Sequence, residues 1–144
     1  MKVCGVELKG SEAIISLVGY DQGAFQVPDC RQRLFTVSQS EDTDVIRQFQ
    51  FAFKKLLEDY HIDEVVILRR EQKGKFAGSS TSFKLEAAIQ LIGLPVSVLA
   101  TAQVKEQFKA APPSTDFGGL ELKKFQQPAF NAAYAFLNMK LDQR

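Results

Sequence analysis

The sequence contains few of the residues that build thiolate metal sites, disulfide frameworks or histidine-dependent active sites. Its 144 residues include two cysteines, Cys4 and Cys30, and one histidine, His61. So few cysteines, one of them in an apolar segment, indicate reduced thiols in a cytoplasmic protein. A lone histidine without a cysteine-rich cluster argues against a zinc site, and it leaves no Ser-His-Asp or Cys-His constellation for nucleophilic catalysis.

Long apolar runs and a strong net charge are missing as well. No run reaches the roughly 18 apolar residues that indicate a membrane span, and Glu7 and Lys9 interrupt the N-terminal stretch that a signal peptide would need. We therefore expect a cytoplasmic protein without membrane contact. The net charge is only +1, so any basic site for nucleic acid must be local.

The apolar content of 45% is enough for the core of a single domain over residues 1–144. The first third favours β-structure, with strands expected at 2–8, 12–19 and 31–37 and a turn at Gly10. Helical and buried-strand patterns then alternate. We expect helices from 40–44 to 60, from 78–82 to 93, from 101–102 to 108 and from 128 to 139, and strands at 65–68 and 95–99.

This element order, β-β-β-α-β-α-β-α, predicts an α/β fold. The three leading strands are expected to form an antiparallel meander. The later strands are separated by helices, so they should run parallel to one another with right-handed crossovers. The sequence therefore predicts a mixed five-stranded sheet with helices on both faces.

Two glutamates occur in or directly after strand-like segments. Glu7 lies inside the first apolar run, and Glu71 follows the buried strand at 65–68. A carboxylate in a central strand is costly to desolvate unless it has a partner. Glu7 could face water or pair with Lys9, and Glu71 could pair within its own basic neighbourhood. The alternative is that the two carboxylates converge on a site that binds a cation.

Basic and hydroxyl residues surround Glu71 in the sequence. The four cations are Arg69, Arg70, Lys73 and Lys75. They could form a solvated surface, or they could contact the phosphate backbone of a nucleic acid beside the acidic site. The stretch 78–82 that follows is most simply a helix cap, but the start of a helix can also bind an anion.

The motifs around both glutamates resemble those of a known group of proteins. The stretch Gly5-Val6-Glu7-Leu8-Lys9-Gly10 is similar to the first-strand motif of Holliday-junction resolvases, in which an aspartate precedes a tight turn. Arg70-Glu71-Gln72 is similar to their second motif, a Glu-Gln pair that ends the fourth strand. With the element order, these motifs make the chain resemble the resolvase branch of the ribonuclease-H-like fold. More closely, the whole chain resembles a bacterial family known as domain of unknown function 3010.

The resemblance implies a site in which carboxylates from the first strand, the fourth strand and the last helix surround two magnesium ions. Glu7 would match the first position and Glu71 the second, so both are expected to bind Mg²⁺ or Mn²⁺. The last helix departs from the pattern, because Pro128 and Asn131 stand where acids are expected. Asn131 would be a weaker third catalytic ligand. The expected substrate contacts are Arg70, Lys73, Lys75 and Ser80.

Three functional hypotheses follow. The first is a divalent-metal-dependent nuclease, intact or degenerate, that acts on structured DNA or RNA. The second is a binding or scaffolding module that keeps the fold without hydrolytic activity. The third is a nucleotide-binding or small-ligand-binding protein that uses the helix start at 78–82. A homodimer is compatible with all three.

Overall fold

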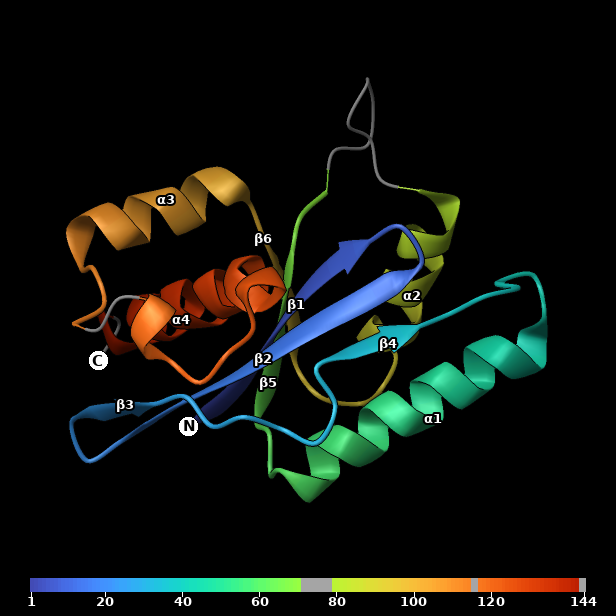
Figure 1. The fold of residues 1–144 in the computed structure, drawn as a ribbon, viewed down its shortest axis with the longest axis horizontal. Coiled ribbons are helices and arrows are strands. Elements are labelled where there is room, and N and C mark those ends of the chain that lie inside the picture. The colour runs from blue at the N-terminus through green and yellow to red at the C-terminus, as the bar shows by residue number, and fades with distance from the viewer. Residues whose placement is uncertain (71–78, 115–116, 143–144) are drawn as a thin grey trace.

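The chain forms a mixed β-sheet with helices on both sides (Figure 1). The computed structural model describes residues 1–70, 79–114 and 117–142. The strands are β1 (Lys2–Lys9), β2 (Glu12–Asp21), β3 (Ala24–Gln26), β4 (Leu34–Thr36), β5 (Glu64–Leu68) and β6 (Val96–Leu99). The helices are α1 (Thr43–Asp59), α2 (Ser80–Gln90), α3 (Thr101–Ala110) and α4 (Gln127–Asp142), with short 3-10 helices η1 (Phe117–Gly119) and η2 (Lys124–Gln126).

The sheet has the strand order β3-β2-β1-β5-β6, and β4 also pairs with β2. β1 and β2 form an antiparallel hairpin because Gly10, with φ of +60°, makes the tight turn between them. β1 then runs parallel to β5, and β5 runs parallel to β6. The expected combination of antiparallel leading strands and parallel later strands is confirmed.

The outer edge of the sheet differs from the predicted meander. No strand was predicted between residues 19 and 31, but Gln22 and Gly23 both have positive φ, 50° and 81°, and form a two-residue turn into β3. β3 pairs with residues 19–21 of β2, whereas β4 pairs with residues 12–14. Two short strands therefore share one edge of β2, and the sheet has six strands instead of five.

One face of the sheet is covered by α1 and α2. α1 begins where the Asp42 side chain accepts a hydrogen bond from the backbone N–H of Asp44, as expected for an N-cap. Its apolar stripe then packs on the side chains of β1 that point to this face. The buried members of this core include Cys4, Val6, Leu8, Phe49, Phe53, Leu56, Leu57, Leu85 and Ile89. None of the described helices is both long and apolar enough to cross a membrane.

The other face is covered by α4, with α3 packed beside it (Figure 1). α4 lies so close to β1 that a Cβ atom placed on Gly5 would be 2.0 Å from the carbonyl oxygen of Ala129. At the other end of the helix, Lys140 Nζ lies 3.9 Å from Glu64, the first residue of β5. α4 therefore runs opposite to β1 and β5, and it begins at the edge of the sheet where those two strands end.

Candidate functional site

Glu7 lies near the end of β1, on the face covered by α4. Side chains alternate along a strand, so Glu7 points to the same side as Gly5, which contacts α4. The carboxylate is half-buried, and burial raises its pKa above the ordinary value of 4.5, while Lys9 acts in the opposite direction. In the described part of the chain, the carboxylate has no side-chain hydrogen bond or ion pair. Ionised Glu7 is thus partly desolvated without a close partner, a state that a cation would relieve.

The segment that contains Glu71 begins and ends at the same edge of the sheet. β1 and β5 are parallel neighbours, so their carboxyl ends meet there. The chain continues past β5 to Arg69, whose backbone N–H donates to Leu99 at 2.8 Å. It returns at Ser79, whose hydroxyl donates to the carbonyl of Gly10, just beyond β1, at 2.8 Å. Glu71 itself, with Lys73 and Lys75, lies outside the described residues.

The hydroxyl-rich stretch forms the start of α2. Ser79 is the N-cap, and its side chain accepts a hydrogen bond from the backbone N–H of Ser82 at 3.1 Å. The Thr81 hydroxyl lies 2.9 Å from that of Ser40, which ties α2 to the segment before α1. Ser80 begins the helix and is exposed. This stretch therefore serves as a helix cap, and a substrate contact at Ser80 remains a prediction.

Arg70 has partners within the fold. Its guanidinium lies 4.3 Å from the ring centre of Phe83 and 3.2 Å from the Glu86 carboxylate, both on α2. Only 9% of its side chain is exposed, although Nε and Nη1 have no hydrogen-bond partner among the described residues. The sequence suggested a surface cation for phosphate. The arginine instead packs against α2. These contacts hold the end of the chain that follows β5 beside α2.

Asn131 lies on α4 but not on the side of the helix that faces β1. The sheet-facing side is marked by Ala129 and Ala133, which both approach Gly5. At about 100° per residue, Asn131 is turned roughly 160° from each of them. It shares a side of the helix with Asn138, whose amide donates to the carbonyl of Ala111. The helical phase therefore argues against Asn131 as a ligand beside Glu7.

The described residues do not complete a metal centre by themselves. Within residues 1–70, 79–114 and 117–142, no group of three or more His, Cys, Asp or Glu side chains could hold an ion. Of the two carboxylates predicted to bind metal, these ranges contain only Glu7. A divalent ion at this edge would therefore need Glu71, and the chemistry of the two carboxylates suits Mg²⁺ or Mn²⁺, which prefer oxygen ligands.

The sequence analysis missed a second set of residues, which lie along β2. Gln126 is fully buried, and its amide donates to the carbonyl of Ile15 in β2 at 2.9 Å. This bond holds the stretch Lys123–Phe125 against the outer side of β2. The backbone carbonyl of Arg33 accepts a hydrogen bond from the N–H of the same Ile15. Arg33 and Gln126 therefore both contact β2 at Ile15. The pair Lys123-Lys124 before the last helix was the only sequence signal.

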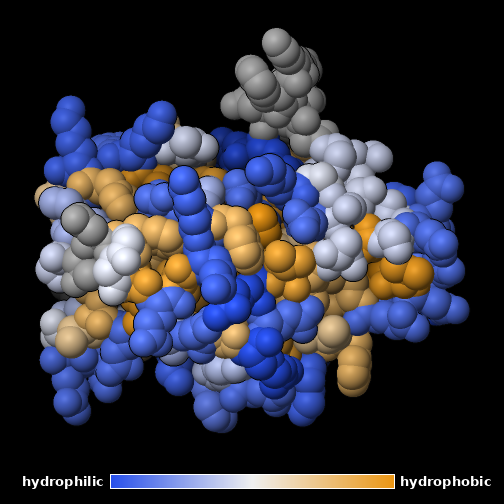
Figure 2. Space-filling view, in the orientation of Figure 1, coloured by the Kyte–Doolittle hydropathy of each residue, from blue (hydrophilic) through white to orange (hydrophobic). Residues whose placement is uncertain are grey.

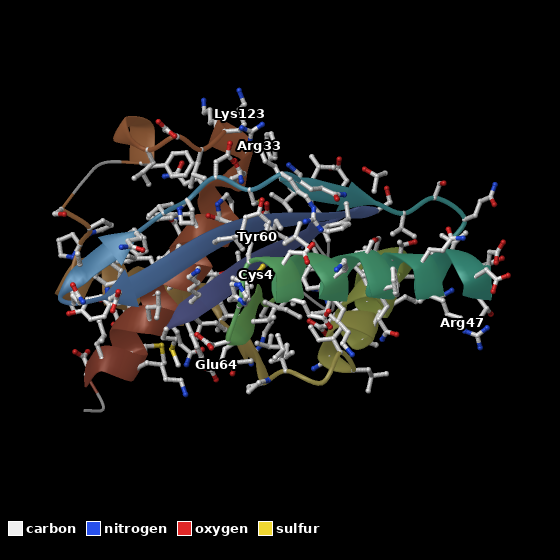
Figure 3. The ribbon with its side chains drawn as sticks, turned by 90° about the horizontal axis from the view of Figure 1, so that it is seen from below. Cys4, Arg33, Arg47, Tyr60, Glu64 and Lys123 are labelled. Carbon is white, nitrogen blue, oxygen red and sulfur yellow. The ribbon has the colours of Figure 1, made fainter. Side chains whose placement is uncertain are left out.

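These residues form a local basic surface. Arg33 donates to Asp29, and this hydrogen bond, together with the charges of Arg33 and Lys123, lowers the pKa of Asp29. Figure 3 shows Arg33 and Lys123 side by side, and Figure 2 shows hydrophilic residues next to hydrophobic patches in the middle of the face it presents. Lys123 and Lys124 are exposed, and Phe125 beside them is 43% exposed. We call Arg33, Lys123, Lys124 and Phe125 the basic surface.

Solved structures share this architecture over nearly the whole chain. The chain aligns with the Thermus thermophilus RuvC structure with a TM-score of 0.77 and 13% identity, covering 99% of this chain and 97% of that one. T. thermophilus RuvC in complex with Holliday junction substrate gives 0.73 and 12% identity over 98% and 95%. Fowlpox virus resolvase with its Holliday junction DNA gives 0.50 and 11% over 95% and 99%. The chain therefore has the ribonuclease-H-like fold predicted from its element order.

Comparison by sequence identifies the family. No curated protein sequence matches the chain. The model of one family, described as a protein of unknown function (DUF3010), matches residues 1–136. This match covers most of the 144 residues, and it confirms the whole-chain resemblance to this family that was found in the sequence. The chain is a member of the DUF3010 family, built on a ribonuclease-H-like fold.

Proposed function

We propose that this protein is a divalent-metal-dependent nuclease that acts on structured nucleic acid. One observation carries the proposal: Glu7 is a half-buried carboxylate without a close partner in the described residues, at the edge where β1 and β5 end. A half-buried carboxylate without a partner destabilises the fold, because its desolvation is not compensated. Its presence in a fold shared with resolvases supports a role in binding a cation.

Glu7 and Glu71 are the proposed ligands of Mg²⁺ or Mn²⁺. When bound, such an ion would polarise a phosphodiester and favour ionisation of an attacking water. Glu7 would contribute one oxygen ligand from β1, and Glu71 would contribute a second from the chain that leaves β5. The pair supports one ion more readily than two, because the helical phase turns Asn131 away from β1.

The basic surface is the proposed contact for the nucleic-acid backbone. It lies along β2, the strand next to β1, so a duplex arm resting on it would pass the edge that carries Glu7. Lys123 and Lys124 would neutralise phosphates, and the exposed ring of Phe125 could stack on an unpaired base. Lys73 and Lys75 remain predicted contacts and lie outside the described residues. The two resolvase complexes with Holliday junctions support a branched substrate.

The second candidate is a binding module without hydrolytic activity. It is favoured by the lack of a third acidic ligand in the described ranges and by the engagement of Arg70 with α2. Such a module would use the same basic surface and would bind branched DNA in the absence of a metal ion. The free thiols of Cys4 and Cys30 suit the cytoplasmic location that we propose for either function.

Binding and cleavage of a labelled four-way DNA junction separate the two candidates. For the nuclease, we expect cleavage with Mg²⁺ or Mn²⁺, none with a chelator, and loss of cleavage without loss of binding in Glu7→Gln. Junction binding without cleavage under every metal condition would instead identify the binding module.

A charge variant tests where the junction binds. Lys123→Gln with Lys124→Gln should weaken binding and reduce the slope of log affinity against log salt by up to about 2, at roughly 0.9 per lost phosphate contact. Lys105→Gln, on the exposed side of α3, removes the same kind of charge elsewhere and should leave binding unchanged. If the two changes weaken junction binding equally, the basic surface is not the site where the junction binds.

A further inference from the structure

The outer surface of α1 and α2 carries exposed apolar side chains. Phe51 on α1 is 74% exposed, and Leu91 at the end of α2 is 77% exposed, the two largest values for big apolar residues in the described chain. The amide of Gln50 donates to the carbonyl of Ala88 at 2.8 Å, so the two helices touch next to these residues. Phe51 and Leu91 thus belong to two adjoining helices, which cover the side of the sheet opposite α4 (Figure 1).

A groove of about 260 Å³ opens between the last turns of α1 and the chain that follows α2, next to Leu91 in the sequence. Its apolar lining comes from α1 and from the chain that follows each of the two helices: Leu57, Ile62, Ile92 and Leu94. Two opposite charges, Lys54 and Glu58, stand on its α1 side. The surface thus presents an aromatic projection, an apolar hollow and one charge of each sign within a short length of helix.

The order of these features along α1 makes the surface complementary to itself. Phe51, Lys54 and Glu58 lie within an arc of about 60° on the exposed side of the helix. If two α1 helices cross antiparallel about the level of residue 56, Lys54 of each copy faces Glu58 of the other. The same arrangement brings each Phe51 level with the partner's His61, which lines the groove. A two-fold axis requires this kind of pairing, in which each contact occurs twice.

The ion pairs within α1 leave these charges available. Asp59 pairs with Lys55 at 3.2 Å, and Asp44 lies 3.7 Å from Arg47. Among the ion pairs of the described residues, Lys54 and Glu58 do not occur, although they are four residues apart on one helix. An interface with a second copy would give both Lys54 and Glu58 a partner of opposite charge.

We propose that this surface binds a second copy of the chain, with the α1 helices antiparallel, Phe51 of each copy in the groove of the other, and Lys54 opposite Glu58 of the partner subunit. Buried aromatic side chains supply much of the affinity of such interfaces, and complementary charges fix their register. The interface lies on the face away from α4, so both copies would keep Glu7 and the basic surface open.

Light scattering after size-exclusion chromatography, over a dilution series of the full chain, tests the proposal. We expect a dimer that dissociates on dilution. Phe51→Ser should give monomers, whereas Phe125→Ser, a matched change on the basic surface, should leave the dimer intact. A monomeric wild-type protein at every concentration, or a Phe51→Ser variant that stays dimeric, would overturn the proposal.

Charge exchange tests the register of the two helices. Lys54→Glu and Glu58→Lys should each raise the dissociation constant by at least about tenfold, because each places like charges opposite one another twice. The double variant K54E/E58K should recover the wild-type value, and Lys105→Glu on α3 should have no effect. All these positions are exposed, and melting curves verify that each variant folds. A double variant no better than the single ones would refute the antiparallel arrangement.

Discussion

On the face covered by α1 and α2, large side chains fill the space above the sheet. The rings of Phe35, Phe49 and Phe53 have centres 5.4 to 5.8 Å apart. On the other face, small residues let the backbone of α4 come close to Gly5 in β1. Above β1, the first face is thus held by the volume of its side chains, whereas the second is held by the close approach of the α4 backbone to Gly5.

This difference shows how the fold can tolerate an unpaired carboxylate. Close contact between α4 and Gly5 fixes the start of the helix beside the end of β1. Glu7 comes two residues later, where the side chains are no longer fully enclosed. The hydroxyl of Ser16, opposite Gly5, is also buried without a hydrogen-bond partner among the described residues.

The largest expected effect is on the face held by volume. Phe53→Ala should lower the free energy of unfolding by about 4 kcal/mol, because the ring is fully buried and leaves a cavity. Urea denaturation measures this loss. Phe125→Ala, at a half-exposed phenylalanine, should cost clearly less, and equal losses would show that the α1 face is not close-packed.

On the face held by close approach, adding one methyl group should be almost as harmful. Gly5→Ala should cost about 3 kcal/mol, since its Cβ would lie 2.0 Å from Ala129 O and 2.9 Å from the Ala133 methyl group. Gly19→Ala is the matched control, because a Cβ there meets only an ordinary contact of 3.5 Å with the Lys2 side chain. If both glycine variants unfold at the same urea concentration, α4 does not pack as described.

The bond that anchors the basic surface should have a smaller effect. Gln126→Leu should cost about 2 kcal/mol, because it leaves the carbonyl of Ile15 buried without its partner. The change should also weaken junction binding, since Lys123 and Lys124 lose their fixed position. Gln127→Leu, at the exposed neighbouring residue, should change neither quantity, and melting curves with binding assays would reveal any other outcome.

The smallest effect concerns Glu7 and has the opposite sign. Burial raises its pKa above 4.5, so the folded state binds this proton more tightly than the unfolded state does. The resulting stability is present at low pH and is lost as pH rises through the folded-state pKa. Without metal, Glu7→Gln should therefore melt higher than the wild type at neutral pH, and this difference should vanish below pH 4.5. A variant that melts lower at neutral pH would contradict the desolvation argument.

The sequence was sufficient for the order and type of most elements because their signals are local. The alternating pattern of β1 and β2, the helical stripe of α1 and the short apolar runs of β5 and β6 each depend on neighbouring residues. β3 was missed because three residues after the Gln22-Gly23 turn carry little periodicity. The edge was assigned as a meander because sequence order does not reveal that β3 and β4 pair with different ends of β2.

The site was harder to predict because it depends on contacts between distant segments. The fold brings the ends of β1 and β5 together, and Glu7 lies at that edge. The sequence could not show that Arg70 would pair with Glu86 on α2, or that the phase of α4 would turn Asn131 away from β1. It also gave no sign that Gln126 would reach Ile15 and hold Lys123 beside Arg33, since those residues are far apart in the chain.

The most direct test of the account is a crystal of the protein soaked in manganese and examined by anomalous diffraction. We predict a single manganese peak at the edge where β1 and β5 end, with carboxylate oxygens of Glu7 and Glu71 as ligands, and no such peak in Glu7→Gln. If the wild-type crystal shows no manganese peak at either carboxylate, or shows one that survives in Glu7→Gln, Glu7 is not a metal ligand and the proposed nuclease site is wrong.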